Sequence, residues 1–455
     1  MARISIIGGA GYVGLAYAAA LADLGHEVWG LDLDDAKVQA LSAGHCPIYE
    51  PGLAELIQRG LSTGRLRFTT DYGQAVPGAE FLFLCVGTPS DEQGRADLSY
   101  VVEATKSLAR HLDGHTILVN KSTLPVGSVT LVEGLLMRHA EPGVTYAVVS
   151  NPEFLREGSA VHDLMHPDRV VLGGSNADAV QRVAELYASF GAPIVVTDPR
   201  SAELIKYASN AFLAAKISFI NEIALICEQL GGDVASVTSG IGLDQRIGRA
   251  FLNAGVGFGG SCFPKDVRAL TMMARDAGLD SSLLTAILDI NRRMRLVVVE
   301  KLENSLGDLR GRSITLLGLA FKPDTDDVRE APAIDIVDAL VAREARVRVS
   351  DPAALEHVEG RWNGVELIED PYAAAMGADA VVLVTDWNQY RVIDLTKLAN
   401  SMRGDVLVDG RRVFSPAQAA AAGLTYLGIG HSSETVSPRA FDLASYGAYL
   451  SMAAD

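Results

Sequence analysis

The first 32 residues carry the pattern that most restricts how this chain can fold. An apolar run over residues 3–7 is followed by Gly8-Gly9-Ala10-Gly11-Tyr12-Val13-Gly14 and then by an alanine-rich segment of helical character. This order predicts a strand, a tight turn and a helix. Gly9 would permit the turn, Gly11 would let a pyrophosphate lie against the helix N-terminus, and Gly14 would allow close packing of helix on strand. A glycine turn of purely structural use is the alternative.

A carboxylate follows at the spacing that a dinucleotide site requires. The apolar run from Glu27 to Leu31 ends at Asp32, about 20 residues beyond the glycines, where an acidic side chain accepts hydrogen bonds from an adenosine ribose. The charge of Asp32 would repel a 2′-phosphate, and no arginine follows it directly. The pattern therefore favours NAD over NADP.

Composition limits the class of protein. With 455 residues, two or three domains are expected, and 49% apolar content is ordinary for a globular protein. A net charge of −17 argues against a nucleic-acid surface. No apolar run approaches the ~20 residues of a membrane helix, and the first strand starts too early for a signal peptide, so we expect a cytoplasmic protein without membrane insertion. The four cysteines form no CxxC pair, which argues against a metal site and a disulfide framework; they are Cys46, Cys85, Cys227 and Cys262.

The order of apolar segments predicts an α/β protein of three domains. Residues 1–200 alternate apolar strands with amphipathic segments, which is typical of a doubly wound parallel sheet of Rossmann type. Residues 201–306 are expected to be helical and begin with a long helix, 202–230. Because this helix is apolar on most of its circumference, we expect it to supply a subunit interface. Residues 307–455 contain a second Rossmann-like α/β unit without a full glycine fingerprint. The expected strands are 80–86, 116–119, 146–149, 193–196, 313–317, 346–349, 380–384 and 406–408.

One segment has the composition of a reactive thiol site. In Gly257-Phe258-Gly259-Gly260-Ser261-Cys262-Phe263-Pro264-Lys265-Asp266, a cysteine lies in a glycine-rich loop just before an amine and a carboxylate. A nearby cation favours the thiolate, which is the nucleophilic form of cysteine. A buried structural cysteine in a ligand-free turn is the alternative.

Acid/base groups occur in pairs spaced by four residues. Glu153 and Glu157 form one pair, and Lys206 and Asn210 form another on the predicted long helix, where this spacing means the same face. An amine and an amide in a cleft can polarise an alcohol and hold a water, while a glutamate can relay a proton. Surface helix pairs are the alternative. Basic residues near glycine-rich or polar motifs are candidates for an anionic substrate: Lys121, Lys206, Arg246, Lys265, Lys322, Arg329 and Arg411.

Taken in order, these segments resemble the UDP-glucose/GDP-mannose dehydrogenase family of nucleotide-sugar dehydrogenases. The resemblance covers nearly the whole chain and rests on residues 47–53, Gly87-Thr88-Pro89, Lys121-Ser122-Thr123, and residues 151–158, 244–248, 257–266 and 321–329. It implies a four-electron oxidation of UDP-glucose to UDP-glucuronate that consumes two NAD, through a thiohemiacetal and a thioester on Cys262. A homodimer or a higher homo-oligomer is implied as well.

The same resemblance implies roles for individual residues. The implied catalytic set is Cys262, Lys206, Asn210, Asp266, Glu157 and Thr123. The implied sugar-nucleotide set is Glu153, Phe154, Leu155, Lys206, Asn210, Phe258, Gly259, Phe263, Lys322 and Arg411, with Arg246 from a neighbouring subunit. The expected cofactor set is Gly9, Gly11, Tyr12, Val13, Gly14, Asp32, Lys37, Thr88, Thr123, Glu157, Lys265 and Arg329.

Other functions stay open at this point. A GDP-mannose dehydrogenase would share the thiol loop, although residues 47–53 and 244–248 look more like the UDP-glucose branch. A single-step hydroxyacid dehydrogenase would need neither Cys262 nor a second α/β domain. A non-catalytic NAD sensor would leave Cys262, Lys206 and Asp266 without a task.

Overall fold

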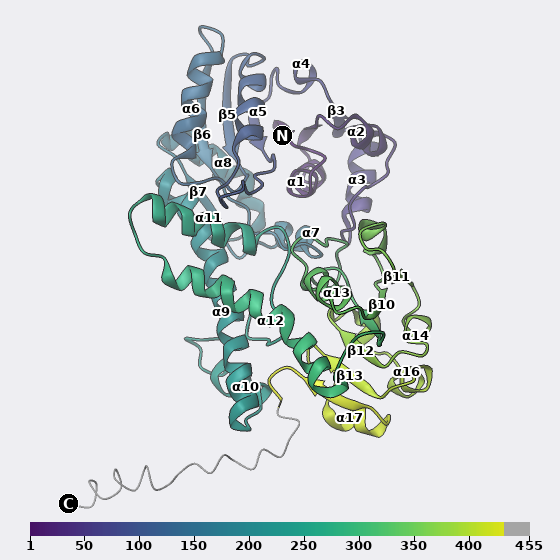
Figure 1. Ribbon diagram of the computed structural model, residues 1–455. Helices are drawn as coiled ribbons and strands as arrows, with labels where there is room; N and C mark the ends of the chain where they lie inside the picture. The colour runs from purple at the N-terminus through teal and green to yellow at the C-terminus, as the bar shows by residue number, and fades with distance from the viewer. Residues whose placement is uncertain (432–455) are drawn as a thin grey trace, which may run out of the picture. The chain divides into compact units, whose positions relative to one another are not determined.

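The computed structural model describes residues 1–431, which form two compact units (Figure 1). Unit 1 comprises Met1–Ala211 and Lys265–Ser281, and unit 2 comprises Phe212–Pro264 and the described residues from Ser282 onward. The division falls within two helices, α9 (Pro199–Leu230) and α11 (Phe263–Asp276). Each unit is built on its own sheet, as the α/β prediction required.

Unit 1 contains an eight-stranded sheet of order β3-β2-β1-β4-β5-β6-β7-β8. Neighbouring strands in this sheet run parallel, except for β6 and β7, which pair antiparallel through Ser150 and Gly173. The central strand β4 is apolar along its whole length, and β5 is buried from Thr116 to Asn120, as expected for strands covered on both faces. The strands are β1 (Arg3–Ile7), β2 (Glu27–Leu31), β3 (Leu66–Thr69), β4 (Phe81–Leu84), β5 (His115–Asn120), β6 (Thr145–Ser150), β7 (Val170–Gly173) and β8 (Ile194–Thr197).

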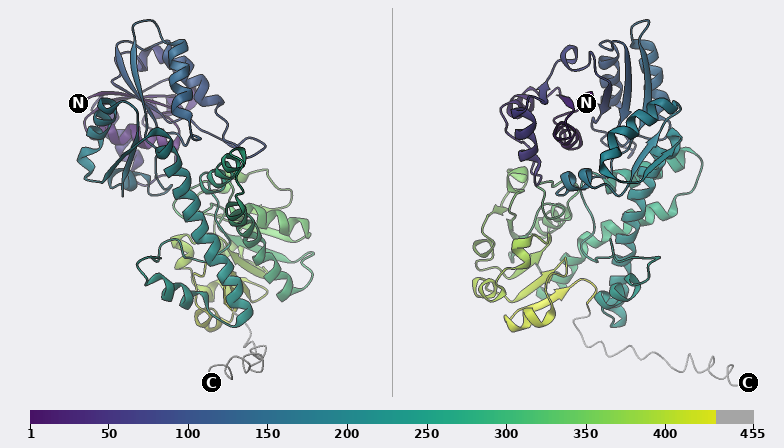
Figure 2. Two further views of the ribbon diagram at one scale, coloured as in Figure 1. Left: turned by 90° about the vertical axis from the view of Figure 1, so that its left-hand side faces the viewer. Right: turned by 180° about the vertical axis from the view of Figure 1, so that it is seen from behind.

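Helices cover both faces of this sheet, as Figure 2 shows. One apolar cluster joins the sheet to α1, α3, α7 and α8, and another joins it to α4, α5 and α6. Their bounds are α1 (Tyr12–Asp23), α2 (Asp35–Ser42), α3 (Leu53–Ser62), α4 (Tyr72–Ala75), α5 (Ser99–Ala109), α6 (Ser128–His139), α7 (Ala160–Met165) and α8 (Ala177–Tyr187). The doubly wound arrangement places the polar loops at the carboxyl ends of the strands, where such sheets bind ligands.

Unit 2 contains a second parallel sheet, of order β11-β10-β9-β12-β13-β14. Its strands are β9 (Ser313–Leu317), β10 (Arg346–Ser350), β11 (Glu366–Leu367), β12 (Ala380–Leu383), β13 (Val406–Asp409) and β14 (Thr425–Gly428). The second half of α9 shares one apolar core with this sheet and its helices. The remaining helices are α10 (Val234–Gly242), α12 (Ser282–Leu306), α13 (Pro332–Ala342), α14 (Pro371–Ala374), α15 (Asn388–Arg391), α16 (Leu395–Ser401) and α17 (Pro416–Ala421).

All ten predicted strands, including those at 3–7 and 27–31, are present within a few residues, and the predicted long helix is α9. The sequence missed β3, β7, β11 and β14, which are short strands at or near the sheet edges.

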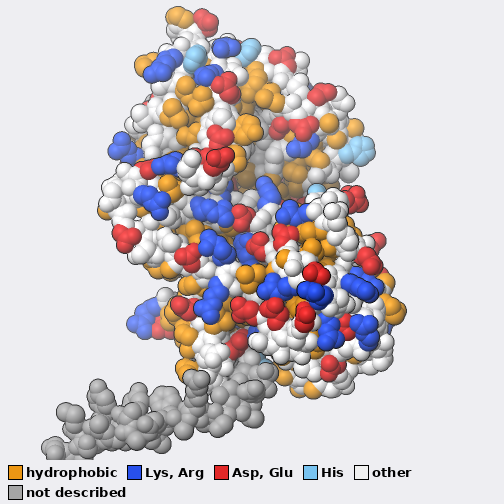
Figure 3. Space-filling model, viewed as in Figure 1, with side chains coloured by type: hydrophobic (Ala, Val, Ile, Leu, Met, Phe, Trp, Pro, Cys, Tyr) orange, Lys and Arg blue, Asp and Glu red, His pale blue; other side chains and the backbone are white. Residues whose placement is uncertain are grey.

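The expectation that no segment reaches membrane-spanning length is wrong for α9. By length and composition alone, this helix is long and apolar enough to cross a membrane. The core helix of a soluble protein passes the same test, and 44% of its most apolar window is buried. Figure 3 shows basic and acidic side chains interspersed over one face.

Candidate active site

The glycine fingerprint forms the turn between β1 and α1, with Gly11 as the residue before the helix. Gly8 takes the left-handed conformation, at φ +83°. Gly9 lies within the turn and cannot carry a side chain, because a Cβ there would lie 2.6 Å from the Cα of Gly30 on β2. A Cβ on Gly14 would lie 2.1 Å from the carbonyl oxygen of Gly8, as the predicted close packing of helix on strand demands.

Asp32 follows β2 and is held toward the glycine turn. Its Oδ2 accepts a hydrogen bond from the backbone N–H of Ala10 at 3.0 Å, and its Oδ1 accepts one from Asp34 at 3.2 Å. The ammonium of Lys37 lies 3.5 Å from Asp34 on the following helix. The carboxylate of Asp32 is therefore fixed beside the turn that precedes α1, where dinucleotide-binding folds carry an acidic residue.

Tyr12 connects this turn to the segment before α7. Its hydroxyl bonds to the carboxylate of Glu50, and both groups accept from the backbone N–H of Gly158. Glu50 also accepts from Ala160 at 2.7 Å. Burial, together with the bond to Glu50, raises the pKa of Tyr12 well above its usual range, with a smaller contribution from the charge of Glu157. Glu157 thus lies close enough to act electrostatically on the first residue of α1.

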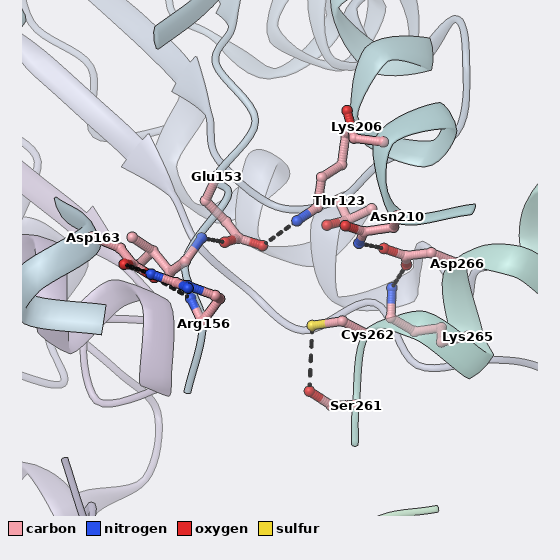
Figure 4. A network of polar contacts seen from close by, with 12 residues as sticks. Thr123, Glu153, Arg156, Asp163, Lys206, Asn210, Ser261, Cys262, Lys265 and Asp266 are labelled. Atoms are coloured by element: carbon pink, nitrogen blue, oxygen red, sulfur yellow. Dashed lines mark hydrogen bonds and ion pairs between the residues drawn. The ribbon is translucent and has the colours of Figure 1, made fainter. Parts of the chain in front are cut away.

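A buried ion pair joins the segment after β6 to α9. Nζ of Lys206 lies 2.8 Å from Oε1 of Glu153, and the side chains are only 3% and 7% exposed (Figure 4). Oε2 of Glu153 accepts a second bond from the N–H of Leu155 at 2.6 Å. Burial by itself raises the pKa of Glu153, but the charge and hydrogen bonds of Lys206 and Leu155 outweigh it and hold that pKa below its ordinary value.

The two glutamates do not share a helical face, because residues 151–158 form no helix. Glu153 pairs with Lys206, and Glu157 is half-buried beside the glycine turn. The helical interpretation is correct for Lys206 and Asn210, which both lie on α9 and are both buried. The surface-pair alternative is therefore wrong for them.

A second polar group links α9 to α11. The side-chain amide of Asn210 donates to Oδ2 of Asp266 at 2.6 Å, and Nζ of Lys265 lies 2.6 Å from Oδ1 of the same carboxylate (Figure 4). Asp266 is fully buried. Thr88 and Thr123 lie on neighbouring loops after β4 and β5, where the hydroxyl of Thr88 donates to the carbonyl of Thr123 at 3.0 Å. Unit 1 thus gathers the predicted acid/base residues other than the thiol.

The thiol loop belongs to unit 2 and ends where α11 begins. Gly257 and Gly260 have φ values of +90° and +83°, which glycine adopts without strain. A Cβ on Gly259 would lie 2.3 Å from the carbonyl oxygen of Glu330, so no larger residue fits. The Ser261 hydroxyl lies 3.6 Å from the sulfur of Cys262, directly before α11 (Figure 4).

Two side chains hold this loop to the core of unit 2. Asn291 of α12 bonds to both the N–H and the carbonyl of Phe258, at 2.7 and 3.0 Å. Arg411 donates to the carbonyls of Val384, Gly257 and Phe321, at 2.7, 3.1 and 3.4 Å. Burial lowers the pKa of Arg411. These bonds explain how the loop keeps a defined shape with so many glycines.

The remaining predicted residues have these positions. Phe154 packs under the guanidinium of Arg169 at 3.7 Å from the ring centre, and Phe263 lies edge-on to Phe258. Lys322 lies 5.5 Å from the ring centre of Phe321, and Arg329 pairs with Asp327. Arg246 is 89% exposed and pairs with Asp244. Val13 is the second residue of α1.

Sequence reasoning missed the groups that support the site. The sequence patterns include Glu50 only as part of a family segment, Lys121 only within a family motif and as a candidate for an anionic substrate, and Asn291 not at all. Burial of a charged or amide side chain is the signal that identifies them, and this requires the fold. Residues 1–431 contain no cluster of histidine, cysteine and carboxylate side chains able to hold a metal ion.

The comparisons with known proteins agree with this geometry. Residues 2–191, 200–293 and 315–416 match the NAD binding, central and UDP binding domains of the UDP-glucose/GDP-mannose dehydrogenase family. A UDP-glucose 6-dehydrogenase of Bacillus subtilis (strain 168) is 45% identical over 94% of this chain and 93% of its own.

Solved structures give the same result. The UDP-glucose dehydrogenase of Pyrobaculum islandicum is 43% identical, with a TM-score of 0.89 over 95% of this chain and 98% of that one. A GDP-mannose dehydrogenase of Pseudomonas aeruginosa is 33% identical, with a TM-score of 0.53 over 94% and 99%. From its fold, its fingerprint and these matches along nearly its whole length, the chain belongs to the UDP-glucose/GDP-mannose dehydrogenase family of NAD-dependent oxidoreductases.

Proposed function

We propose that this protein is a UDP-glucose 6-dehydrogenase, which oxidises the 6-hydroxyl of UDP-glucose to the carboxylate of UDP-glucuronate. The observation that carries the proposal is the buried pair of Lys206 and Glu153, together with the hydrogen bond from Asn210 of α9 to Asp266 of α11, the helix that begins directly after Cys262. A buried amine beside a buried carboxylate is suited to proton transfer.

The residues around the glycine turn fit NAD. The N-terminus of α1 and the close backbone at Gly9, Gly11 and Gly14 suit a pyrophosphate, and Asp32 suits a ribose with a free 2′-hydroxyl. Tyr12, Val13, Lys37, Thr88, Thr123, Glu157, Lys265 and Arg329 complete the proposed cofactor set. When bound, NAD supplies the hydride acceptor for both oxidations.

Lys206 and Glu153 are the proposed proton-handling pair. An alcohol that loses hydride must also lose a proton, and an amine that hydrogen-bonds to its oxygen stabilises the developing charge. Glu153 holds Lys206 in place and can take the proton from it. We assign the acid/base role beside Lys206 to Glu153, which contacts that amine directly, and place Glu157 in the cofactor set because its charge acts on Tyr12 at the start of α1.

Cys262 is the proposed nucleophile for the second oxidation. Its thiolate adds to the carbonyl carbon of the aldehyde, forming a C–S bond, and the oxygen takes up a proton. Loss of hydride and of that proton leaves a thioester on Cys262. Water then attacks the thioester carbon, the C–S bond breaks, and the thiolate and the sugar acid are released. Asn210 and Asp266 are the proposed residues that orient this water, since an amide and a carboxylate hydrogen-bonded to each other can share one.

A set of aromatic, basic and polar residues is proposed to contact the sugar nucleotide. The proposed set is Glu153, Phe154, Leu155, Lys206, Asn210, Phe258, Gly259, Phe263, Lys322 and Arg411, with Arg246 from a second subunit. The family's UDP binding domain matches residues 315–416, and this supports uridine as the base. GDP-mannose is the second candidate. The lower identity and TM-score of the GDP-mannose dehydrogenase favour UDP-glucose.

We further propose a cytoplasmic homodimer or higher homo-oligomer whose subunits meet on α9. Phe212, Phe219 and Ile226 are exposed at spacings of seven residues, which places them on one face of the helix. Such an exposed apolar stripe is typical of an interface. We retain the division into a cofactor domain (1–200), a central domain (201–306) and a substrate domain (307–455) as part of this proposal.

The stoichiometry of NADH formation tests the proposed reaction. Limiting UDP-glucose with excess NAD should yield two NADH per sugar nucleotide and UDP-glucuronate, with no aldehyde accumulating. Thioester hydrolysis is strongly downhill, so UDP-glucuronate and NADH should give no measurable reverse reaction. One NADH per substrate with an aldehyde or ketone product would instead indicate a single-step dehydrogenase. GDP-mannose and other nucleotide sugars in parallel reactions test the choice of substrate.

A further inference from the structure

Lys121 is a lysine buried almost completely inside unit 1. It follows β5 directly and is 1% exposed. Its Nζ lies 4.3 Å from the ring centre of Tyr17 on α1 and 5.6 Å from that of Tyr187 on α8. Its hydrogen bond is to an amide, Oδ1 of Asn151, at 3.1 Å. Among residues 1–431, no carboxylate forms an ion pair with it.

Burying a charged ammonium in this position costs free energy, so packing requirements alone would not select a lysine here. Lysine is almost never fully buried without a partner, and taking an ammonium out of water carries a large desolvation penalty. Burial lowers the pKa of Lys121 to about 7, although the nearby Cys85 thiol and Glu153 act in the opposite direction. A methionine would fill the same space without this cost, so packing alone does not explain the lysine.

The bond to Asn151 connects Lys121 to the proposed active site. Oδ1 of Asn151 also accepts from the hydroxyl of Tyr187 at 2.5 Å, and its amide donates to the carbonyl of Val171 at 2.9 Å. These bonds fix the first residue of the non-helical segment that follows β6. Glu153 stands two residues further along that segment, where it pairs with Lys206. Lys121 therefore lies behind the backbone that presents Glu153.

We propose that Lys121 is a positioning residue for the dehydrogenase reaction, which holds the Asn151–Glu153 segment through Asn151 and uses its charge to keep Glu153 a carboxylate directed at Lys206. This inference rests on the proposed function. It assigns a role to Lys121, a buried cation that takes no part in the proposed proton transfer or in the thiol chemistry.

Lys121 is surrounded by titratable groups from five elements. They are Tyr17 of α1, Cys85 after β4, Glu153 after β6, Tyr187 of α8 and Lys206 of α9. Burial raises the pKa values of Tyr17, Cys85 and Tyr187, so these groups are neutral near pH 7. The charges that Lys121 acts on are therefore those of Glu153 and Lys206. Removal of Lys121 takes away one of the cations that lower the pKa of Glu153.

The test is Lys121→Met in the full-length protein, with Tyr187→Phe as the matched control. Both variants remove one hydrogen bond to Oδ1 of Asn151, but only the first removes the charge. Lys121→Met should lower kcat with UDP-glucose about 100-fold, as misplacement of a catalytic group does. It should also move the acidic limb of the kcat–pH profile to higher pH. NAD affinity should be unchanged and Tm unchanged or raised, because a buried charge has been removed. Tyr187→Phe should keep the wild-type acidic limb.

The outcomes separate this inference from the proposed function. Wild-type protein that forms no NADH from any nucleotide sugar would contradict the function itself. Active wild type with a Lys121→Met variant of normal kcat and pH profile would contradict only the role of Lys121. A lower Tm in both Lys121→Met and Lys121→Gln, with a kcat–pH profile unchanged in shape, would assign Lys121 a structural role and also overturn the inference. Loss of folded protein in both variants would do the same.

Discussion

Nζ of Lys206 lies 2.8 Å from Oε1 of Glu153, and the segment that carries Glu153 is separated from Lys206 by 53 residues of sequence. The pair is nearly sealed from solvent in the described structure. Attraction between two charges is strong in such a place, and so is the cost of losing either partner. This relationship identifies Glu153 as a carboxylate coupled directly to the amine of Lys206.

Glu153→Gln and Glu157→Gln should therefore have different effects. Glu153→Gln removes the carboxylate beside Lys206 and should lower kcat by about 100-fold or more, which is the usual contribution of an acid/base group. Glu157→Gln should act mainly on the KM for NAD, because Glu157 lies beside the first turn of α1. Steady-state kinetics with each substrate varied in turn will distinguish the two. Equal losses of kcat would contradict the assignment.

Lys206→Met should destabilise the folded protein in a pH-dependent manner. It leaves Glu153 buried without its cation, which costs about 3–5 kcal/mol when a buried pair is broken. The folded-state pKa of Glu153 is below its ordinary value, so the stability it contributes is present above the ordinary pKa and is lost as pH falls through the folded value. The difference between wild type and variant in urea unfolding should be full at pH 7 and shrink at acidic pH. A difference independent of pH would indicate lost packing instead.

Cys262→Ser should bind NAD normally and nearly abolish acid formation. A serine alkoxide is far harder to generate than a thiolate near neutral pH, so the acyl-enzyme would form very slowly. Product analysis by chromatography and NAD titration by fluorescence are the measurements. Cys46→Ser is a suitable control because Cys46 is also partly exposed, but lies outside the thiol loop. Near-normal turnover of Cys262→Ser would remove the thiol from the mechanism.

Asp32→Ala should weaken NAD binding and reduce the preference of the protein for NAD over NADP. The variant loses the acceptor for the ribose hydroxyls and the charge that repels a 2′-phosphate. Dissociation constants for both cofactors are the measurement, and circular dichroism should show an unchanged fold. Asp35→Ala, which removes a carboxylate three residues further on at the first residue of α2, is the matched control. An unchanged preference for NAD would mean that the ribose lies elsewhere.

Phe219→Glu should shift the protein to a smaller assembly. It places a charge in the middle of the exposed stripe on α9, and a buried unpaired charge would disfavour association. Light scattering after size-exclusion chromatography is the measurement. Met137→Glu introduces the same charge at an exposed apolar position on α6 and should have no effect. If Phe219→Glu keeps the wild-type mass, α9 is not the interface.

Features that depend on residues close together in the sequence could be predicted without a structure. The strand, glycine turn and helix at the N-terminus, the helical spacing of Lys206 and Asn210, and the main strands of both sheets follow from local periodicity and turn chemistry. The glycine-rich setting of Cys262 was visible for the same reason. The short strands near the sheet edges were missed, because a strand of two to four residues leaves too weak a periodic signal.

Tertiary structure alone decided which distant side chains meet. Spacing by four placed Glu153 and Glu157 on one helical face, but residues 151–158 form no helix, and their different environments depend on contacts with α1 and α9. Likewise, the sequence shows Lys121 only as a basic residue of a polar motif, and the fold shows that its side chain is buried. The sequence by itself determined the fold class, the cofactor turn and the thiol loop. Pairing, burial and protonation depend on the surrounding dielectric and on neighbours many residues away, so only the folded chain defines them.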